Sequence, residues 1–171
     1  MPPFTIAQVN AMPLSDFVAA FGDVAEHSPW VAEAAEKARP FSDREDMIAA
    51  FAAVIQAADR ARQRDLLLAH PDLAGRAAIA GELTADSRRE QAGAGLDRLT
   101  PEEFARFSEL NAAYRARHGI PFILAVRGAT KNEIIAACAA RTPNDPDEEL
   151  RTAIAQVCRI VRFRLEDRVR G

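Results

Sequence analysis

The amino-acid sequence predicts an all-α protein, a single-domain bundle of about eight helices with two ordered loops that line a pocket. Signals that begin helices recur along the chain, whereas the alternating runs of β-branched residues typical of strands are nearly absent. A chain of 171 residues, 49% of them hydrophobic, is long enough to bury one sizeable core. We therefore expect one domain over residues 1–171, with its core over about residues 14–169.

The helices are predicted from N-terminal caps followed by apolar residues at helical spacing. Three pairs match the capping box, in which a hydroxyl and an acidic side chain each bind the other residue's backbone N–H: Ser42 and Glu45, Thr100 and Glu103, and Thr130 and Glu133. Ser28 before Pro29 is a further start signal, because proline favours the first turn of a helix. Together these signals predict helices over residues 15–21, 29–38, 43–58, 60–69, 85–94, 101–117, 131–141 and 146–168.

Two segments do not fit the helical pattern and are predicted to be ordered loops, at residues 70–84 and 119–129. Pro71 disfavours the α conformation at His70, so the imidazole is expected at a rigid corner after a helix. In the second loop, Pro121 begins an apolar stretch. Because no second strand is predicted to pair with this stretch, we expect buried extended chain whose backbone groups find other partners.

The composition argues against several classes of partner. The 22 Lys and Arg residues nearly balance the 25 Asp and Glu residues, so no basic field is available to hold nucleic acid or an anionic membrane. The longest apolar runs are far shorter than the roughly 20 residues that span a bilayer. Cys138 and Cys158 have a spacing typical of neither a zinc site nor a disulfide framework. We expect a cytoplasmic protein that binds a small molecule or another protein.

Of the three histidines, His70 has the strongest claim to a functional role. Its backbone is fixed by Pro71, and the apolar run at residues 66–69 anchors the turn before it. A histidine in a helical protein is otherwise more often a surface or capping residue. His118, which precedes Gly119 at the expected end of a helix, is sufficiently explained by a favourable interaction with the helix dipole.

The predicted helix over residues 85–94 has a polar face. Ser87, Glu90 and Gln91 share this face by helical spacing, whereas Arg88 points elsewhere. An acid, an amide and a hydroxyl together are ordinary on a solvated surface, and the residues alone favour that interpretation. The functional alternative is that the face lines a pocket, where Glu90 exchanges a proton with His70 or orients it.

The predicted helix over residues 146–168 carries one apolar stripe, formed by Leu150, Ile154, Val157, Val161 and Leu165. Arg164 falls within the stripe, whereas Arg159 and Arg162 fall outside it. A guanidinium that faces a core needs a carboxylate, backbone carbonyls or a ligand, since leaving it unpaired is costly. An internal salt bridge, a side chain that snorkels to the helix end and a ligand contact all stay open at this point.

Several short motifs follow one another in order along the chain: His70-Pro71-Asp72-Leu73-Ala74-Gly75, Leu83-Thr84, Ser87-Arg88-Arg89-Glu90-Gln91, Ala94-Gly95-Leu96, Leu110-Asn111, Tyr114, Gly119 with Pro121-Phe122-Ile123, Arg159-Ile160 and Arg164-Leu165. This ordered set resembles the family of 2-oxo-4-hydroxy-4-carboxy-5-ureidoimidazoline (OHCU) decarboxylases. The resemblance runs from about residue 14 to the end of the chain. No single motif is specific, but the ordered set is.

The resemblance implies a catalytic histidine at His70 and a partner acid at Glu90. It places substrate contacts at Pro71, Ser87, Gln91, Phe122, Ile123, Leu124, Ala125, Val126 and Arg164. One departure is the stretch His118-Gly119-Ile120-Pro121, where many family members carry aromatic residues beside the glycine and proline. This departure concerns the fit of the pocket wall rather than the chemistry.

The activity implied by the resemblance is decarboxylation of OHCU to (S)-allantoin in urate degradation, with neither a cofactor nor a metal. The substrate carries its own electron sink, because the carbon that bears the carboxylate adjoins a ring C=N bond. His70 would deliver a proton to one face of the enol-like intermediate that remains after CO₂ is lost, and Glu90 would set the tautomer and orientation of the imidazole. The resemblance does not say which of the two accepts the hydroxyl proton.

Two other functions are compatible with the same fold. One is a non-enzymatic binding or assembly module, whose polar face and Arg164 would serve a partner protein. The other, a histidine–metal hydrolase, is disfavoured because His27, His70 and His118 have no metal-binding spacing. For the decarboxylase, we expect a small-molecule ureidoimidazoline substrate. The resemblance also raises the prospect of a homodimer and of functional coupling to urate oxidase and hydroxyisourate hydrolase.

Overall fold

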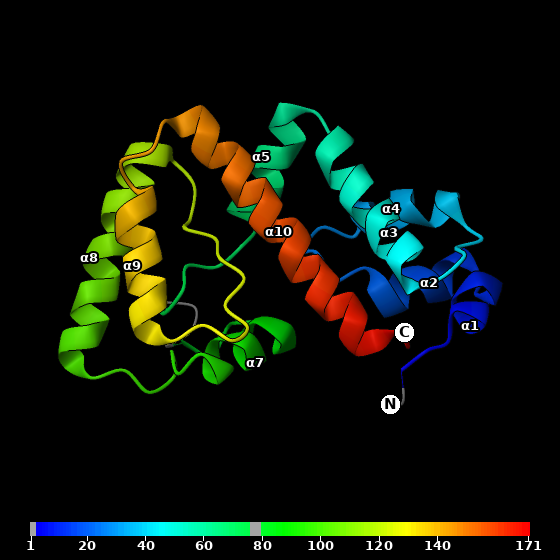
Figure 1. The fold of residues 1–171 in the computed structure, drawn as a ribbon, viewed down its shortest axis with the longest axis horizontal. Coiled ribbons are helices and arrows are strands. Elements are labelled where there is room, and N and C mark those ends of the chain that lie inside the picture. The colour runs from blue at the N-terminus through cyan, green and yellow to red at the C-terminus, as the bar shows by residue number, and fades with distance from the viewer. Residues whose placement is uncertain (1–2, 76–79) are drawn as a thin grey trace. The chain divides into compact units, whose positions relative to one another are not determined.

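The computed structural model describes residues 3–75 and 80–171, and within these residues it contains helices and no β-strand (Figure 1). An isolated β-bridge pairs Phe4 with Val169. The all-α prediction is confirmed. The chain divides into two compact units, one formed by Met1–Ala69 with Val157–Gly171 and the other by His70–Gln156.

The first unit contains α1 (Ile6–Ala11), α2 (Leu14–Phe21), α3 (Trp30–Ala35) with the 3-10 turn η1 (Glu36–Ala38), α4 (Arg44–Ala57), α5 (Arg60–Leu68) and the end of α10 (Pro146–Arg168). Its core includes Phe17, whose ring centroid lies 5.1 Å from that of Phe21 and 6.2 Å from that of Phe51. The sequence predicted these helices to within a few residues, except α1. That helix begins with a capping box in which glutamine, at Gln8, takes the place of an acid.

One predicted cap is wrong. Ser42 and Glu45 do not form a capping box, because Asp43 is the N-cap of α4 and accepts a hydrogen bond from the Asp46 N–H at 2.7 Å. The Asp46 carboxylate in turn accepts from the Ser42 N–H at 2.9 Å. An ionised carboxylate is a stronger acceptor for an orphan backbone N–H than a hydroxyl, and two carboxylates are within reach here.

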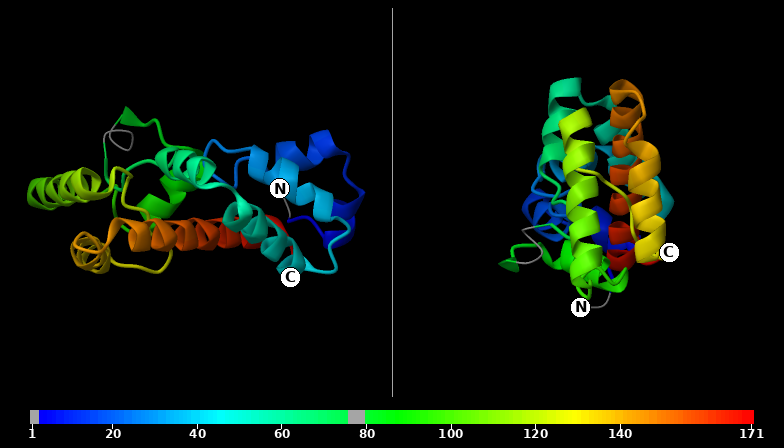
Figure 2. Two further views of the ribbon diagram at one scale, coloured as in Figure 1. Left: turned by 90° about the horizontal axis from the view of Figure 1, so that it is seen from above. Right: turned by 90° about the vertical axis from the view of Figure 1, so that its left-hand side faces the viewer.

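The second unit contains α7 (Ala85–Gly93), α8 (Pro101–His118), α9 (Lys131–Arg141) and the beginning of α10. The capping boxes at Thr100 and Thr130 are confirmed. Helices α8 and α9 lie side by side in both views of Figure 2. The glycine after α8, Gly119, has a left-handed φ of 68°, a conformation that costs a residue without Cβ little.

The two predicted loops both belong to this unit. Part of the first, residues 76–79, lies outside the described residues. In the second, residues 121–126 take neither helix nor strand, as expected, and most of their side chains are buried. Nowhere in residues 3–75 and 80–171 is a helix both long and apolar enough to cross a membrane.

Candidate active site

His70 lies in the bend that directly follows α5. Its side chain is 7% exposed, so it is not the surface residue that histidines of helical proteins usually are. The helix before it ends in two fully buried residues, Leu66 and Leu67, followed by the exposed Leu68. Pro71 follows at once and restricts the backbone of His70 in this bend.

Three of the five residues after His70 are held by side chains of α7 and α8. Three contacts do this: the Gln91 Oε1 accepts from the Ala74 N–H at 3.0 Å, the Asn111 Nδ2 donates to the Leu73 carbonyl at 2.8 Å, and the Arg115 guanidinium donates to the Asp72 carboxylate at 3.3 Å. Because each contact crosses from a helix to an irregular segment, together they fix the backbone that carries His70. Of these two α8 residues, Asn111 belongs to the motifs that resemble the family and Arg115 does not.

The polar face of α7 points inward. Ser87 and Gln91 are 5% and 4% exposed and Glu90 is half-buried, whereas Arg88 and Arg89 are exposed. The interpretation of this face as an ordinary solvated surface is therefore wrong for the serine and the glutamine. A buried polar group costs free energy unless it has a partner, so this face must be satisfied by protein or by a ligand.

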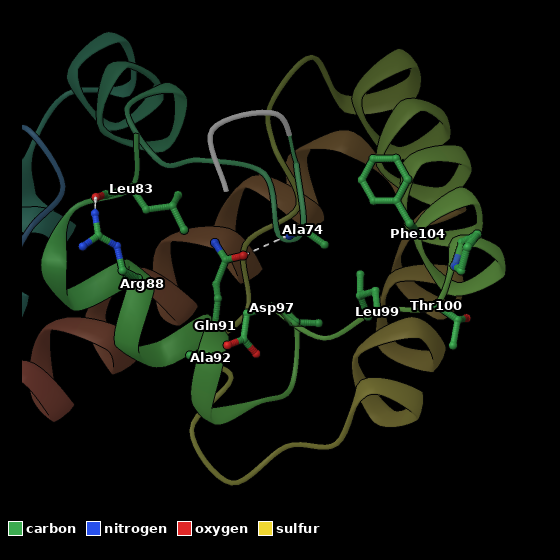
Figure 3. A pocket seen from close by; sticks show the side chains of 11 residues that line it. Ala74, Leu83, Arg88, Gln91, Ala92, Asp97, Leu99, Thr100 and Phe104 are labelled. Carbon is green, nitrogen blue, oxygen red and sulfur yellow. Dashed lines mark hydrogen bonds between the residues drawn. The ribbon is translucent and has the colours of Figure 1, made fainter. Parts of the chain in front are cut away.

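A cavity of about 510 Å³ lies beside Gln91 and is lined by Ala74, Leu83, Arg88, Gln91, Ala92, Leu96, Asp97, Leu99, Thr100, Pro101 and Phe104. Figure 3 shows Gln91 reaching from α7 toward Ala74, with Leu99 and Phe104 across the cavity. Among the described residues, neither His70 nor Glu90 lines it. The Gln91 oxygen accepts from the Ala74 N–H, which orients the side-chain amide and leaves its NH₂ group to donate to a ligand.

The apolar segment Phe122–Val126 finds its backbone partners in side chains of α9 and α10, as the sequence predicted for an extended chain without a second strand. The Arg141 Nη1 donates to the Ile123 carbonyl at 2.7 Å. The Ala125 N–H donates to the Gln156 Oε1 at 3.0 Å. This segment is thereby attached at two points to the helical scaffold of its unit.

Arg141 belongs to a buried network centred on Glu149, whose side chain is 0% exposed. The Glu149 carboxylate accepts from the Arg141 Nε at 2.6 Å, from the Tyr114 hydroxyl at 2.6 Å and from the Asn144 Nδ2 at 3.2 Å. Burial, and then the hydrogen bond to Glu149, raise the pKa of Tyr114 well above its usual value. Sequence reasoning missed this network, because an arginine at the end of a helix is ordinarily explained by the helix dipole.

Arg164 lies in the first unit, and not in the unit that contains His70, Ser87 and Gln91. Its side chain is 2% exposed, which confirms the inference that it faces a core. Two of the expected kinds of partner are present: the Glu26 Oε1 lies 2.8 Å from the Arg164 Nη2, and the Val24 carbonyl accepts from Nη1 at 3.3 Å. Of the three options open from the sequence, the internal salt bridge is present.

Two other side chains that could carry chemistry, His118 and Cys138, lie in positions that a structural role explains. The His118 Nε2 lies 2.9 Å from the Thr142 carbonyl, and burial raises the pKa of the Cys138 thiol to about 11. Over residues 3–75 and 80–171, no group of three or more His, Cys, Asp and Glu side chains is placed to hold a metal ion.

Comparison with known proteins places these residues in a family. The family model described as OHCU decarboxylase matches residues 10–166. The 2-oxo-4-hydroxy-4-carboxy-5-ureidoimidazoline decarboxylase of Mus musculus is 43% identical over 162 residues, which cover 95% of this chain and 91% of the mouse protein. The uric acid degradation bifunctional protein PucL of Bacillus subtilis is 39% identical over 164 residues, 96% of this chain but 32% of PucL.

Among solved structures, a crystal structure of (S)-allantoin synthase matches with a TM-score of 0.79 and 32% sequence identity. The match covers 98% of this chain and 54% of that chain, so this protein spans about half of the allantoin synthase. The family model and the mouse relative both match nearly the whole chain. The chain therefore belongs to the OHCU decarboxylase family.

Proposed function

We propose that this chain decarboxylates OHCU to (S)-allantoin in urate degradation, without a cofactor, and that His70 and Glu90 are its catalytic pair. The family match and the names of the relatives support the reaction. One observation supports the pair above all. The bond between Gln91 and Ala74 ties the inward face of α7, which carries Glu90, to the segment that begins at His70.

The reaction breaks one carbon–carbon bond and forms one carbon–hydrogen bond. The carboxylate leaves as CO₂, and its bonding electron pair moves through the adjacent ring C=N bond onto the ring nitrogen. This leaves an enol, in which the carbon that carried the carboxylate bears the hydroxyl and is double-bonded to the ureido-bearing carbon, while the ring nitrogen takes up a proton. The hydroxyl proton then leaves as that carbon becomes a carbonyl, and a proton is delivered to the ureido-bearing carbon. His70 is suited to deliver it, because an imidazole can both hold and release a proton in the physiological range of pH. Delivery to one face only gives the S enantiomer.

The other predicted residues hold the substrate in this proposal. Glu90 sets the tautomer and orientation of His70, while Ser87 and Arg164 bind polar groups of the ring and the ureido chain. Gln91 donates an N–H of its NH₂ group to a substrate carbonyl, in the orientation that its bond to the Ala74 N–H sets. Pro71 forms part of the wall beside the imidazole.

The segment Phe122–Val126 provides the apolar wall, which favours loss of a solvated carboxylate. The Ile123 carbonyl and the Ala125 N–H bind side chains of α9 and α10. In an extended chain, the backbone groups of the residue between them, Leu124, would point to the opposite side. Within the described residues, no hydrogen bond reaches the N–H or the C=O of Leu124. The Leu124 N–H can therefore donate to the C=O of a ureide, and the Leu124 C=O can accept from its N–H.

Turnover of freshly generated substrate tests the proposed function. Urate oxidase and hydroxyisourate hydrolase would supply the unstable OHCU in the cuvette, and circular dichroism would follow (S)-allantoin. We expect the protein to accelerate the appearance of the signal and to give one enantiomer, with the same rate in EDTA. A signal that grows no faster than in the control without protein would contradict the proposal.

The cellular setting belongs to the same proposal. We propose a cytoplasmic enzyme that is functionally coupled to urate oxidase and hydroxyisourate hydrolase, because OHCU is unstable and must be used quickly. The bifunctional uric acid degradation protein, of which this chain matches 32%, supports such coupling. A homodimer stays a prediction that sedimentation of the purified protein would test.

A further inference from the structure

We propose that Arg141 is a positioning residue for the decarboxylation, with Gln156 as a second anchor, because these side chains hold the wall segment Phe122–Val126 in the conformation that meets the substrate. This inference rests on the proposed function of that segment. Neither residue was a candidate from the sequence, and neither is proposed to touch the substrate. Their contribution is to fix the edge of the segment that faces away from the substrate.

The wall segment needs such anchors because it lacks regular secondary structure. Each residue of a helix or sheet is held by its neighbours' backbone, whereas here two backbone groups are bound by side chains from distant parts of the chain. The contacts fall on Ile123 and Ala125, two residues apart, so in extended chain they hold the same edge. Losing either one frees the Leu124 backbone between them to shift.

Arg141 is itself rigidly held, which is what a positioning residue requires. Its Nε donates to the buried Glu149 carboxylate at 2.6 Å while Nη1 donates to the Ile123 carbonyl at 2.7 Å. The guanidinium carbon lies 4.6 Å from the centre of the Phe122 ring, within range of a cation–π interaction. The planar guanidinium therefore contacts the Glu149 carboxylate, the Ile123 carbonyl and the Phe122 ring at once. Lysine cannot reproduce all three contacts.

The first test is Arg141→Lys, which keeps a positive charge beside Glu149 but loses the planar fork. We expect KM for OHCU to rise roughly tenfold, the effect of losing one well-placed hydrogen bond, with kcat changed less than about threefold. Arg117→Lys is the matched control. Arg117 also donates to two backbone carbonyls in the same unit, those of Pro143 and Asn144, but it does not contact the wall segment. We expect Arg117→Lys to keep the wild-type KM.

Amide hydrogen exchange measures the positioning without reference to catalysis. In Arg141→Lys the amides of residues 122–126 should exchange roughly tenfold faster than in the wild type, while those of α8 should not. A general loss of stability would accelerate both sets. This readout separates an effect on the wall segment from partial unfolding.

Gln156 provides an independent test if Arg141→Lys does not fold. Gln156→Met removes the acceptor for the Ala125 N–H, and we expect faster exchange of that amide and a higher KM. Gln156→Glu keeps an oxygen acceptor of the same reach, so it should restore both to within about twofold of the wild type. A purely structural role for Gln156 would not produce this pattern in KM.

The outcomes separate this inference from the proposed function. A wild-type KM in folded Arg141→Lys or in Gln156→Met overturns the positioning role, and so does faster exchange with no change in KM. Wild-type protein that shows no turnover of OHCU overturns the proposed function, and with it the catalytic consequence of Arg141. Turnover by the wild type together with a selective rise in KM in both variants supports both.

Discussion

The two units each contain a buried arginine–glutamate pair, and the pairs differ in what else the arginine holds. Arg164 binds Glu26 and the carbonyl of Val24, both in the short stretch that precedes α3. Arg141 binds Glu149 and also the carbonyl of Ile123, in a segment that has no regular structure. The first arginine ties a loop to the core of its unit, whereas the second ties a proposed substrate wall to its scaffold.

This difference shows that a buried ion pair does not reveal its role through the pair alone. A guanidinium has five N–H donors, and a single carboxylate uses at most two or three of them. The partners of the remaining donors decide what moves when the arginine is replaced. Stability measurements report on the pair, and kinetic measurements report on the additional partners.

The largest loss of stability is expected for Arg164→Ala, because this variant removes the guanidinium that binds the buried Glu26 carboxylate. Removing one partner of a buried pair typically costs about 3–5 kcal/mol of the free energy of unfolding, and urea denaturation would measure it. The double variant Arg164→Ala with Glu26→Gln should recover part of this loss, since no charge is then left buried. A single variant as stable as the wild type would show that water reaches Glu26.

Tyr114→Phe sharpens the comparison at the other pair, since it deletes one hydrogen bond to Glu149 and leaves Arg141 in place. A hydrogen bond to a charged group contributes about 1.5–3 kcal/mol, so we expect a loss of stability in that range. The pKa of Tyr114 is raised in the folded protein, so its stabilising contribution is complete below the unfolded value of 10.0 and is lost as the pH rises beyond it.

The wild type should therefore lose more stability than Tyr114→Phe between neutral pH and strongly alkaline pH. Urea denaturation of both proteins over this range is the measurement. Parallel curves for the two proteins would show that Tyr114 does not donate to Glu149 in solution.

A smaller loss of stability is expected for Arg164→Lys, because this variant keeps a positive charge beside Glu26. If Arg164 also contacts the substrate, as proposed, loss of its planar fork should raise KM roughly tenfold with nearly unchanged melting. A large loss of melting temperature with normal kinetics in the folded fraction would make Arg164 a structural residue only. The two arginines would then differ in function as well as in partners.

The sequence predicted most of the fold because helices depend on local signals. The bounds of α9 and α10 match the predicted ranges, and the inward position of Arg164 follows from helical spacing alone. The local signal failed at Ser42, where two carboxylates displace the hydroxyl as cap. It also failed at α1, whose capping box uses an amide instead of an acid.

The candidate site was predictable only in part, because its partners come from distant positions. The need of Arg164 for a carboxylate, backbone carbonyls or a ligand could be inferred, but not which, because Glu26 lies 138 residues away and nothing in its own surroundings marks it. Arg141 gave no signal, since its role depends on the carbonyl of Ile123 rather than on any side-chain pattern. The motif residues His70, Ser87 and Gln91 were found from the sequence, and their burial distinguishes them from an ordinary polar surface.

The smallest effect should come from an ion pair at the surface, Glu103 with Lys131. The pKa of Glu103 is lowered, first by the Thr100 backbone N–H and then by Lys131. Its contribution is therefore present above the unfolded value of 4.5 and is lost as the pH falls through the folded pKa. Glu103→Gln should slightly reduce the acid dependence of stability, because both side chains are partly exposed to solvent and the pair is therefore screened. An effect as large as that of Arg164→Ala would contradict the contrast between fully buried pairs and pairs at the surface.

The central claim, that His70 delivers the proton, is tested most directly by the rate of (S)-allantoin formation in His70→Asn. Asparagine is close to the imidazole in shape but cannot act as an acid near neutral pH. We expect at least a roughly 100-fold loss of stereospecific turnover with nearly unchanged melting. His27→Asn, at a histidine that is 68% exposed, is the control and should keep the wild-type rate. A wild-type rate of (S)-allantoin formation in His70→Asn would contradict the account.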